Sequence, residues 1–271
     1  IDTILKYSQR GRIHAEINQL RSEGGGTVTG RFSMNNPNLQ QIPARNKDLG
    51  PRIRSLFIPE ENCKWGCFDY SQQEPRLATH YAFNLGCDGA EDVVNIYNKD
   101  PNADFHDIVS KIANISRTNA KTINLGLLYG MGVKKLAEEL KFDKDLVKEF
   151  LAKFHKQIPF IKDLSNRVSQ YANSTGYVAT LKGRKCRFEL WEPTSFGVFK
   201  ALPYDQAKEK YGRHHALQRA GTYKALNRLI QGSAADQTKQ AMVDLYNEGM
   251  VPLVQIHDEL TLSIDDSKET K

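Results

Sequence analysis

Four side chains with a spacing of four residues, Arg117, Lys121, Leu125 and Tyr129, are the first candidates for chemistry. At about 100° per residue, this spacing places them in a row along one face of a helix. Guanidinium and ammonium groups bind phosphate oxygens, and an aromatic ring offers a plane on which a base stacks. The row therefore indicates a face that clamps phosphates at one end and supports a base at the other. A solvated charged turn that continues into a buried helix is the alternative.

A carboxylate, Asp69, lies at the end of a predicted strand. Residues 64–70 alternate in polarity and are rich in aromatic side chains, which predicts a short strand. Ser71 and Glu74 have the spacing of a capping box, so we expect a helix to begin at Ser71, with Pro75 in its first turn. A carboxylate at this place binds a metal or phosphate group, or simply caps the helix.

A second carboxylate lies in a predicted reversal of the chain. Residues 251–264 alternate as two strands, and the turn must fall within residues 255–259, which include His257, Asp258 and Glu259 but no glycine. Negative charge at a costly turn is expected at a functional site, although a solvent-exposed polar turn has the same composition. If one sheet brings Asp69 and Asp258 together, their hard oxygen ligands predict a site for a divalent cation, preferably magnesium.

Carboxylates that hold metals, with a cationic helix face opposite, form the arrangement that phosphoryl transfer requires. The metals neutralise the phosphates and activate the attacking oxygen, while the cations hold the departing group.

A segment near the N-terminus and one predicted helix have compositions suited to nucleic acid. Residues 29–43 are rich in amides and turn formers, and Arg31, Asn38 and Gln40 have the donors to reach a base edge or sugar. An ordinary loop is the alternative for this segment. Residues 225–246 have helical spacing and carry Asn227 and Gln231 on one face, where neighbouring amides suit the acceptors of a minor groove.

A basic turn at residues 182–185 lies between two predicted strands of a hairpin, residues 176–181 and 186–190. This turn contacts a phosphate backbone or keeps the sheet edge soluble. Residues 3–22 have helical spacing with many charges, and residues 81–170 are predicted to be mainly helical. Residues 191–222 show no clear period.

Composition favours a globular protein with an anionic partner. The chain has 271 residues, 39% of them hydrophobic, a formal net charge of +6 and a pI near 9.0. Nucleic acid is the leading class of partner and acidic membranes the second. The N-terminus lacks the apolar core of a signal peptide, so we expect a cytoplasmic protein, in the host cytoplasm if it is viral. The four cysteines form no CxxC pair, which argues against a zinc site.

Three motifs in this order resemble those of family A DNA polymerases: DYSQQEPR from Asp69, RTNAKTINLGLLYG from Arg117 and QIHDEL from Gln255. Residues 29–43, TGRFSMNNPNLQQIP, resemble the segment that precedes the first motif in that family. The resemblance, over residues 13–264, implies an α+β fold of right-hand architecture. An antiparallel palm sheet (residues 1–76 and 219–271) bears the metals, and mainly helical fingers (residues 77–218) close over the nucleotide.

The resemblance implies template-directed DNA synthesis by two-metal-ion catalysis, with primer–template DNA and deoxynucleoside triphosphates as partners. The implied metal ligands of two Mg²⁺ ions, for which Mn²⁺ is a possible substitute, are Asp69, Asp258 and the Tyr70 carbonyl. Glu259 is the implied accessory acid, and Lys121 the implied proton donor to pyrophosphate. The other implied nucleotide-binding residues are Arg117, Tyr129, Leu125, His106, Gln72 and Glu74, which excludes a 2′-hydroxyl. The implied contacts to the primer terminus and the minor groove are Arg31, Asn227, Gln231 and His257, and the amides of Asn38, Gln40 and Gln41 are further candidates by their composition.

Departures from the family pattern limit these implications. Leu125 stands where these enzymes usually carry Phe or Tyr, and Gln73 and Pro75 replace the usual aliphatic residues around Glu74. These variants favour a phage or other viral source. Residues 191–222 are longer than the corresponding segment. We also expect a fragment without thumb and exonuclease domains, with poor activity when isolated.

Two other functions remain open from the sequence. The first is a nucleic-acid-binding fragment that has lost catalysis, which intact Asp69, Lys121 and Asp258 disfavour. The second is a metal-dependent nuclease, which shares the carboxylates but does not explain the cationic row.

Overall fold

The computed structural model describes residues 2–23, 25–43, 46–195 and 197–265. The chain forms two compact units. Unit 1 comprises residues 1–71 and 234–271, and unit 2 comprises residues 72–233. These boundaries differ from the predicted ones at 76/77 and 218/219. The second boundary, between residues 233 and 234, lies inside helix α11 (Ala225–Asn247). This helix confirms the helical prediction for residues 225–246.

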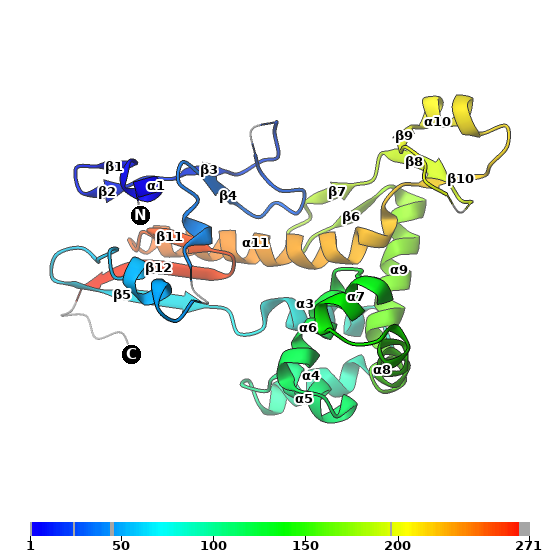
Figure 1. Cartoon of the computed structure of the whole chain (residues 1–271), viewed down its shortest axis with the longest axis horizontal. Coiled ribbons are helices and arrows are strands. Elements are labelled where there is room, and N and C mark those ends of the chain that lie inside the picture. Colours follow the sequence, from blue (N-terminus) through cyan, green and yellow to red (C-terminus); the bar gives the residue numbers. More distant parts are fainter. Residues whose placement is uncertain (1, 24, 44–45, 196, 266–271) are drawn as a thin grey trace. The chain divides into compact units, whose positions relative to one another are not determined.

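An antiparallel sheet of three strands is the main feature of unit 1. Its order is β11–β12–β5, with β5 at Cys63–Asp69, β11 at Val254–Ile256 and β12 at Glu259–Asp265 (Figure 1). The predicted strands over 64–70 and 251–264 are therefore confirmed. β5 and β12 pair along their full length, from Glu259 opposite Asp69 to Asp265 opposite Cys63.

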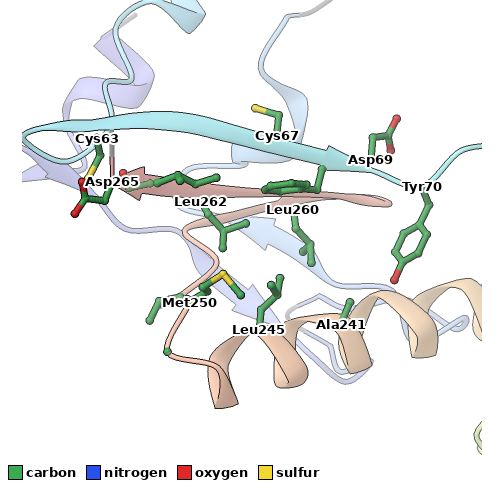
Figure 2. A pocket seen from close by; sticks show the side chains of 15 residues that line it. Cys63, Cys67, Asp69, Tyr70, Ala241, Leu245, Met250, Leu260, Leu262 and Asp265 are labelled. Carbon is green, nitrogen blue, oxygen red and sulfur yellow. The ribbon is translucent and has the colours of Figure 1, made fainter. Parts of the chain in front are cut away.

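Two leucines of β12 give the sheet a buried face. Leu260 and Leu262 are 3% and 2% exposed, and Figure 2 shows their side chains directed toward Ala241 and Leu245 of α11. A side chain at Gly66 would collide with Ile264, because a Cβ there would lie 2.2 Å from Ile264 Cδ1. The hydrophobic contacts below the sheet thus fix which face the side chains of β5 and β12 present.

The rest of unit 1 is built of short elements. They are α1 (Asp2–Leu5), β1 (Ser8–Gln9), β2 (Arg12–Ile13), β3 (Glu16–Asn18), β4 (Ser33–Asn35), η1 (Leu39–Gln41) and α2 (Leu49–Arg54). The prediction of helical structure over residues 3–22 is therefore wrong beyond Leu5. Arg10 and Gly11 both have positive φ, at 53° and 77°, and they join β1 to β2 by a tight two-residue turn.

Unit 2 is mainly helical over residues 81–170, as predicted (Figure 1). Its first seven helices are α3 (Gln73–Asn84), α4 (Ala90–Lys99), α5 (Phe105–Ala113), α6 (Arg117–Leu128), α7 (Val133–Leu140), α8 (Lys144–Gln157) and α9 (Phe160–Thr175). The predicted capping box at Ser71 is wrong. The helix begins at Gln73 after Gln72, which has a left-handed φ of 53° and makes no side-chain cap hydrogen bond.

Two small sheets complete unit 2. The predicted hairpin is confirmed as β6 (Tyr177–Ala179) and β7 (Lys185–Arg187). The segment without a clear period folds into a sheet of order β10–β8–β9 with one helix: β8 (Leu190–Pro193), β9 (Leu202–Pro203), α10 (Tyr204–Tyr211) and β10 (Leu217–Arg219). A short 3₁₀ turn, η2 (Thr222–Lys224), leads into α11. No described helix is long and apolar enough to cross a membrane.

Candidate active site

The end of the unit 1 sheet brings acidic residues together. Asp69 is the last residue of β5 and pairs with Glu259, the first residue of β12, so Asp258 precedes a residue that lies directly across from Asp69. Residues paired across antiparallel strands have Cα atoms about 5 Å apart. The sequence could place these residues on strand ends, but only the register shows that the two ends meet.

Strain accompanies this turn. His257 has a φ of 59°, in the left-handed region that non-glycine residues rarely adopt. Its backbone carbonyl accepts a hydrogen bond from Gln255 Nε2. Glu259 accepts a hydrogen bond at 3.0 Å from the Thr261 hydroxyl. The turn is thus held by its own neighbours in a conformation that leaves Asp258 half-buried, next to the residue that pairs with Asp69.

The donors at this end of the sheet fit a hard divalent cation. Asp69 is exposed, and Figure 2 shows its carboxylate on the side of β5 away from α11, whereas the ring of Tyr70 points toward α11. The described residues contain no group of three or more His, Cys, Asp or Glu side chains placed to hold a metal. The candidate donors at this end of the sheet are the carboxylates of Asp69 and Asp258 and the backbone carbonyl of Tyr70. All are oxygen ligands of the kind that magnesium prefers.

Tyr70 also lines a cavity of about 830 Å³ below the sheet, with Leu245, Met250, Leu260 and Leu262 (Figure 2). Burial raises the pKa of its phenol, and the nearby Asp244 carboxylate raises it further. The Tyr70 side chain therefore stays protonated, and only its backbone carbonyl is a candidate metal ligand.

The predicted DNA contacts of unit 1 lie close to this turn. Arg31 and His257 line one recess together with Lys239 of α11, whose ammonium lies 4.4 Å from the centre of the Phe32 ring. By contrast, Gln40 donates a hydrogen bond at 3.1 Å to the Gln255 side chain, and Asn38 accepts one at 3.1 Å from the Gln40 amide. Asn38 thus caps η1 through the backbone N–H of Gln40, and the Gln40 side chain ties η1 to β11.

The cationic row of unit 2 lies on helix α6, as predicted. Arg117 and Lys121 are exposed, and Leu125 and Tyr129 are half-buried, whereas Ala120, Ile123, Asn124 and Leu128 are buried on the other face. Ser116 caps the helix by accepting a hydrogen bond from the Asn119 amide. Arg117, although exposed, forms ion pairs with Asp104 and Asp107.

Glu74 has a different partner from the one its spacing predicts. Its side chain is 8% exposed and accepts a hydrogen bond at 2.7 Å from the Tyr129 hydroxyl. Glu74 and Tyr129, which the family resemblance places in the nucleotide pocket, are thus in direct contact. Their hydrogen bond joins the first turn of α3 to the end of α6. A sequence spacing could not show this, since 55 residues separate them.

Gln72 and His106 belong to one network at the start of α5. The Gln72 side chain donates to the Ala103 carbonyl at 2.9 Å and accepts from the Phe105 amide at 2.7 Å. His106 is 6% exposed, and its Nδ1 lies 2.9 Å from Asn124 Nδ2 of α6. Burial lowers the pKa of His106, and Lys121 and Arg117 lower it further against the opposing effect of Asp104, which favours the neutral imidazole.

The remaining predicted DNA contacts, Asn227 and Gln231, are half-buried on the first turns of α11. The basic turn of the hairpin is attached to this helix, because Arg184 Nη2 donates to the Gly232 carbonyl at 3.0 Å. Arg184 therefore has a structural role in addition to its charge.

Sequence reasoning missed three residues of these networks: Asp104, Asn124 and Gln255. Asp104 had a signal that could have found it, since an Asp before a helical run is a common N-cap. Asn124 and Gln255 had none, because their partners are distant in the sequence.

Comparison with known proteins agrees with this geometry. Residues 1–271 match the family described as DNA polymerase family A. A DNA-directed DNA polymerase of Pseudomonas phage M6 is 37% identical over 98% of this chain and 44% of its own length. The thermostable DNA polymerase I of Thermus aquaticus is 31% identical over 95% of this chain and 29% of its own length. The phage relative agrees with the predicted viral source.

A solved structure supports the same conclusion. The polymerase domain of Pol1 from M. smegmatis, in complex with DNA primer–template and dNTP, has a TM-score of 0.75 and 28% identity. The match covers 98% of this chain and 44% of that chain, so this chain spans less than half the length of these relatives. With an antiparallel sheet that ends in paired acidic residues, a helical unit that carries the cationic row, and a family match along its whole length, this chain is a member of DNA polymerase family A.

Proposed function

We propose that this chain supplies the palm and fingers of a polymerase that carries out template-directed DNA synthesis. The reaction is nucleotidyl transfer from a deoxynucleoside triphosphate to a primer 3′-hydroxyl. The observation that carries the proposal is the β5–β12 register, which places Asp258 next to the residue opposite Asp69. Family membership, and the primer–template and dNTP bound to the related Pol1 domain, support the choice of substrates.

In this proposal Asp69, Asp258 and the Tyr70 carbonyl hold divalent cations, preferably two magnesium ions, with manganese as a substitute. Bound there, the metals would activate the primer hydroxyl and neutralise the phosphates. Glu259, anchored by Thr261, supplies further negative charge beside the ligands. Because Asp69 is exposed, a cation can reach its carboxylate from solvent.

The residues of α6 bind and protonate the triphosphate. Arg117 and Lys121 hold its oxygens, and buried His106 contacts it in the neutral form. The primer 3′-oxygen forms a bond to the α-phosphorus as the bond to pyrophosphate breaks. Lys121 gives a proton to the departing pyrophosphate, which would otherwise leave with a higher charge.

Nucleotide selection rests on the far end of the same helix. Tyr129 abuts the templating position, and Leu125 and Gln72 line the nucleotide pocket. Glu74, held in place by the Tyr129 hydroxyl, leaves no room for a 2′-hydroxyl. Arg31, His257, Asn227 and Gln231 contact the primer terminus and the minor groove, with Asn38 and Gln40 shaping the loop beside them.

Primer extension with magnesium by the full-length protein tests the proposal. Asp69→Asn and Asp258→Asn should each lower the extension rate by at least about a thousandfold, because each removes a charged ligand. Asp265→Asn at the opposite end of the same sheet is the matched control, and it should extend normally. Unchanged extension in either active-site variant would show that the metal site is misassigned. DNA cleavage without added nucleotides would favour the nuclease instead.

A further inference from the structure

Asp104 uses its two carboxylate oxygens for two different elements. Oδ1 is the N-cap of α5, accepting hydrogen bonds from the amides of His106 at 2.7 Å and Asp107 at 3.4 Å. Oδ2 accepts hydrogen bonds from Arg117 Nε, at 3.0 Å, and from Arg117 Nη2. One side chain thus ties the start of α5 to the first residue of α6.

The Asp104 side chain is held in place by its surroundings, whereas Arg117 has a long, exposed side chain. The Asp104 side chain is 18% exposed, and the Gln72 side chain holds the backbone on both sides of it, at Ala103 and Phe105. The Arg117 side chain is 55% exposed, and a long cationic side chain at such a surface samples many rotamers when it has no partner. Asp104 therefore restricts Arg117, and not the reverse.

The contact leaves part of the guanidinium available. Asp104 binds through Nε and Nη2, and Asp107 lies 3.2 Å from the same Nε. Among the residues that the structure describes, none bonds to Nη1, so this nitrogen can take a phosphate oxygen while the other edge stays bound. A guanidinium with five donors in one plane can serve a carboxylate and a phosphate at the same time.

We propose that Asp104 is a positioning residue, which orients Arg117 toward the triphosphate of the incoming nucleotide. The inference rests on the proposed function. By fixing the rotamer before the nucleotide arrives, Asp104 lowers the entropic cost of binding. Its removal should therefore weaken nucleotide binding and leave DNA binding intact. If Asp104 instead occupied Arg117 in competition with phosphate, its removal would strengthen nucleotide binding.

The test is steady-state primer extension by the full-length protein with Asp104→Ser, which keeps an N-cap oxygen and loses the second oxygen. We expect KM for the nucleotide to rise about tenfold, while kcat and the Kd for primer–template change less than about twofold. Asp143→Ser is the matched control. Asp143 is the N-cap of α8, and its substitution should cost similar stability without changing KM.

A double-mutant cycle separates the inference from the function on which it rests. Arg117→Ala should raise KM, and adding Asp104→Ser should raise it no further, because Asp104 acts only through Arg117. If Arg117→Ala raises KM but Asp104→Ser leaves it unchanged or lowers it, the positioning role alone is overturned. If Arg117→Ala leaves KM unchanged, the triphosphate-binding role of α6 is overturned with it.

Discussion

Single side chains in this molecule serve two elements at once. Glu74 sits in the first turn of α3 and accepts a hydrogen bond from Tyr129 at the end of α6, and Asp104 caps α5 while holding Arg117. Under the proposed function, such residues couple the substrate-binding groups to the scaffold, so the loss of one contact should change both stability and selectivity.

Tyr129→Phe tests this coupling. The variant removes the hydroxyl that donates to Glu74, and the loss of a hydrogen bond to a buried carboxylate should destabilise the chain by about 1–3 kcal/mol in thermal unfolding. Because Glu74 then has more freedom, incorporation of ribonucleotides relative to deoxynucleotides should rise about tenfold in primer extension. Tyr171→Phe, at an exposed position of α9, is the control, and the prediction is wrong if both variants discriminate equally.

At the scale of elements, the strands and long helices followed from their patterns, but their junctions did not. Residues 63–69 form a strand and residues 225–247 form a helix, as the aromatic content of the first and the helical spacing of the second predicted. Around Ser71 the local capping signal was outweighed, since Glu74 is stabilised by a residue far along the chain. In residues 3–22, the Arg10–Gly11 turn prevailed over the helical spacing.

The segment from residue 190 to 219 shows why some elements have no sequence signal. In this sheet β8 lies between β9 and β10. The three strands are only two to four residues long, which is too short for an alternation of polarity to appear in the sequence. Trp191 packs edge-on against Tyr204 at 4.9 Å, and the guanidinium of Arg219 lies over the same indole. These long-range contacts, and not local propensity, form the sheet. The candidate site shows the same limit, because the register that joins Asp69 to Glu259 spans 190 residues.

A glycine in the β11–β12 turn should increase stability and lower activity. His257 has a φ of 59°, so His257→Gly relieves backbone strain and should raise the free energy of unfolding by about 1 kcal/mol. Primer extension should fall nonetheless, because the proposed contact of His257 to the DNA is lost. Arg10→Gly, with a φ of 53° in the β1–β2 turn, should stabilise the chain without affecting extension. Equal extension by His257→Gly and wild type would remove His257 from the site.

On the scale of the whole molecule, each unit carries one of the two tryptophans. Trp65 is in β5 of unit 1, and Trp191 is in β8 of unit 2. The variants Trp191→Phe and Trp65→Phe therefore give fluorescence signals that report one unit at a time.

We expect magnesium to raise the denaturation midpoint reported by Trp65 more than that reported by Trp191. A cation that binds only the folded sheet stabilises it, by about 2.7 kcal/mol at a hundredfold excess over Kd. Asp258→Asn should abolish the shift, and removing the metal with a chelator should reverse it. The metal site is contradicted if Trp65 reports no shift, or if the shift survives in Asp258→Asn.

The pairing of β5 with β12 restricts how many residues can be inserted into β5. Inserting one residue into β5 directly before Asp69 would turn each preceding side chain to the opposite face, so that Trp65 and Cys67 would face α11 and Phe68 would face away from it, whereas inserting two would restore every orientation. In a library of insertions within residues 63–68, tolerated variants should therefore carry two added residues and not one. Length change in this strand is thus permitted in even steps.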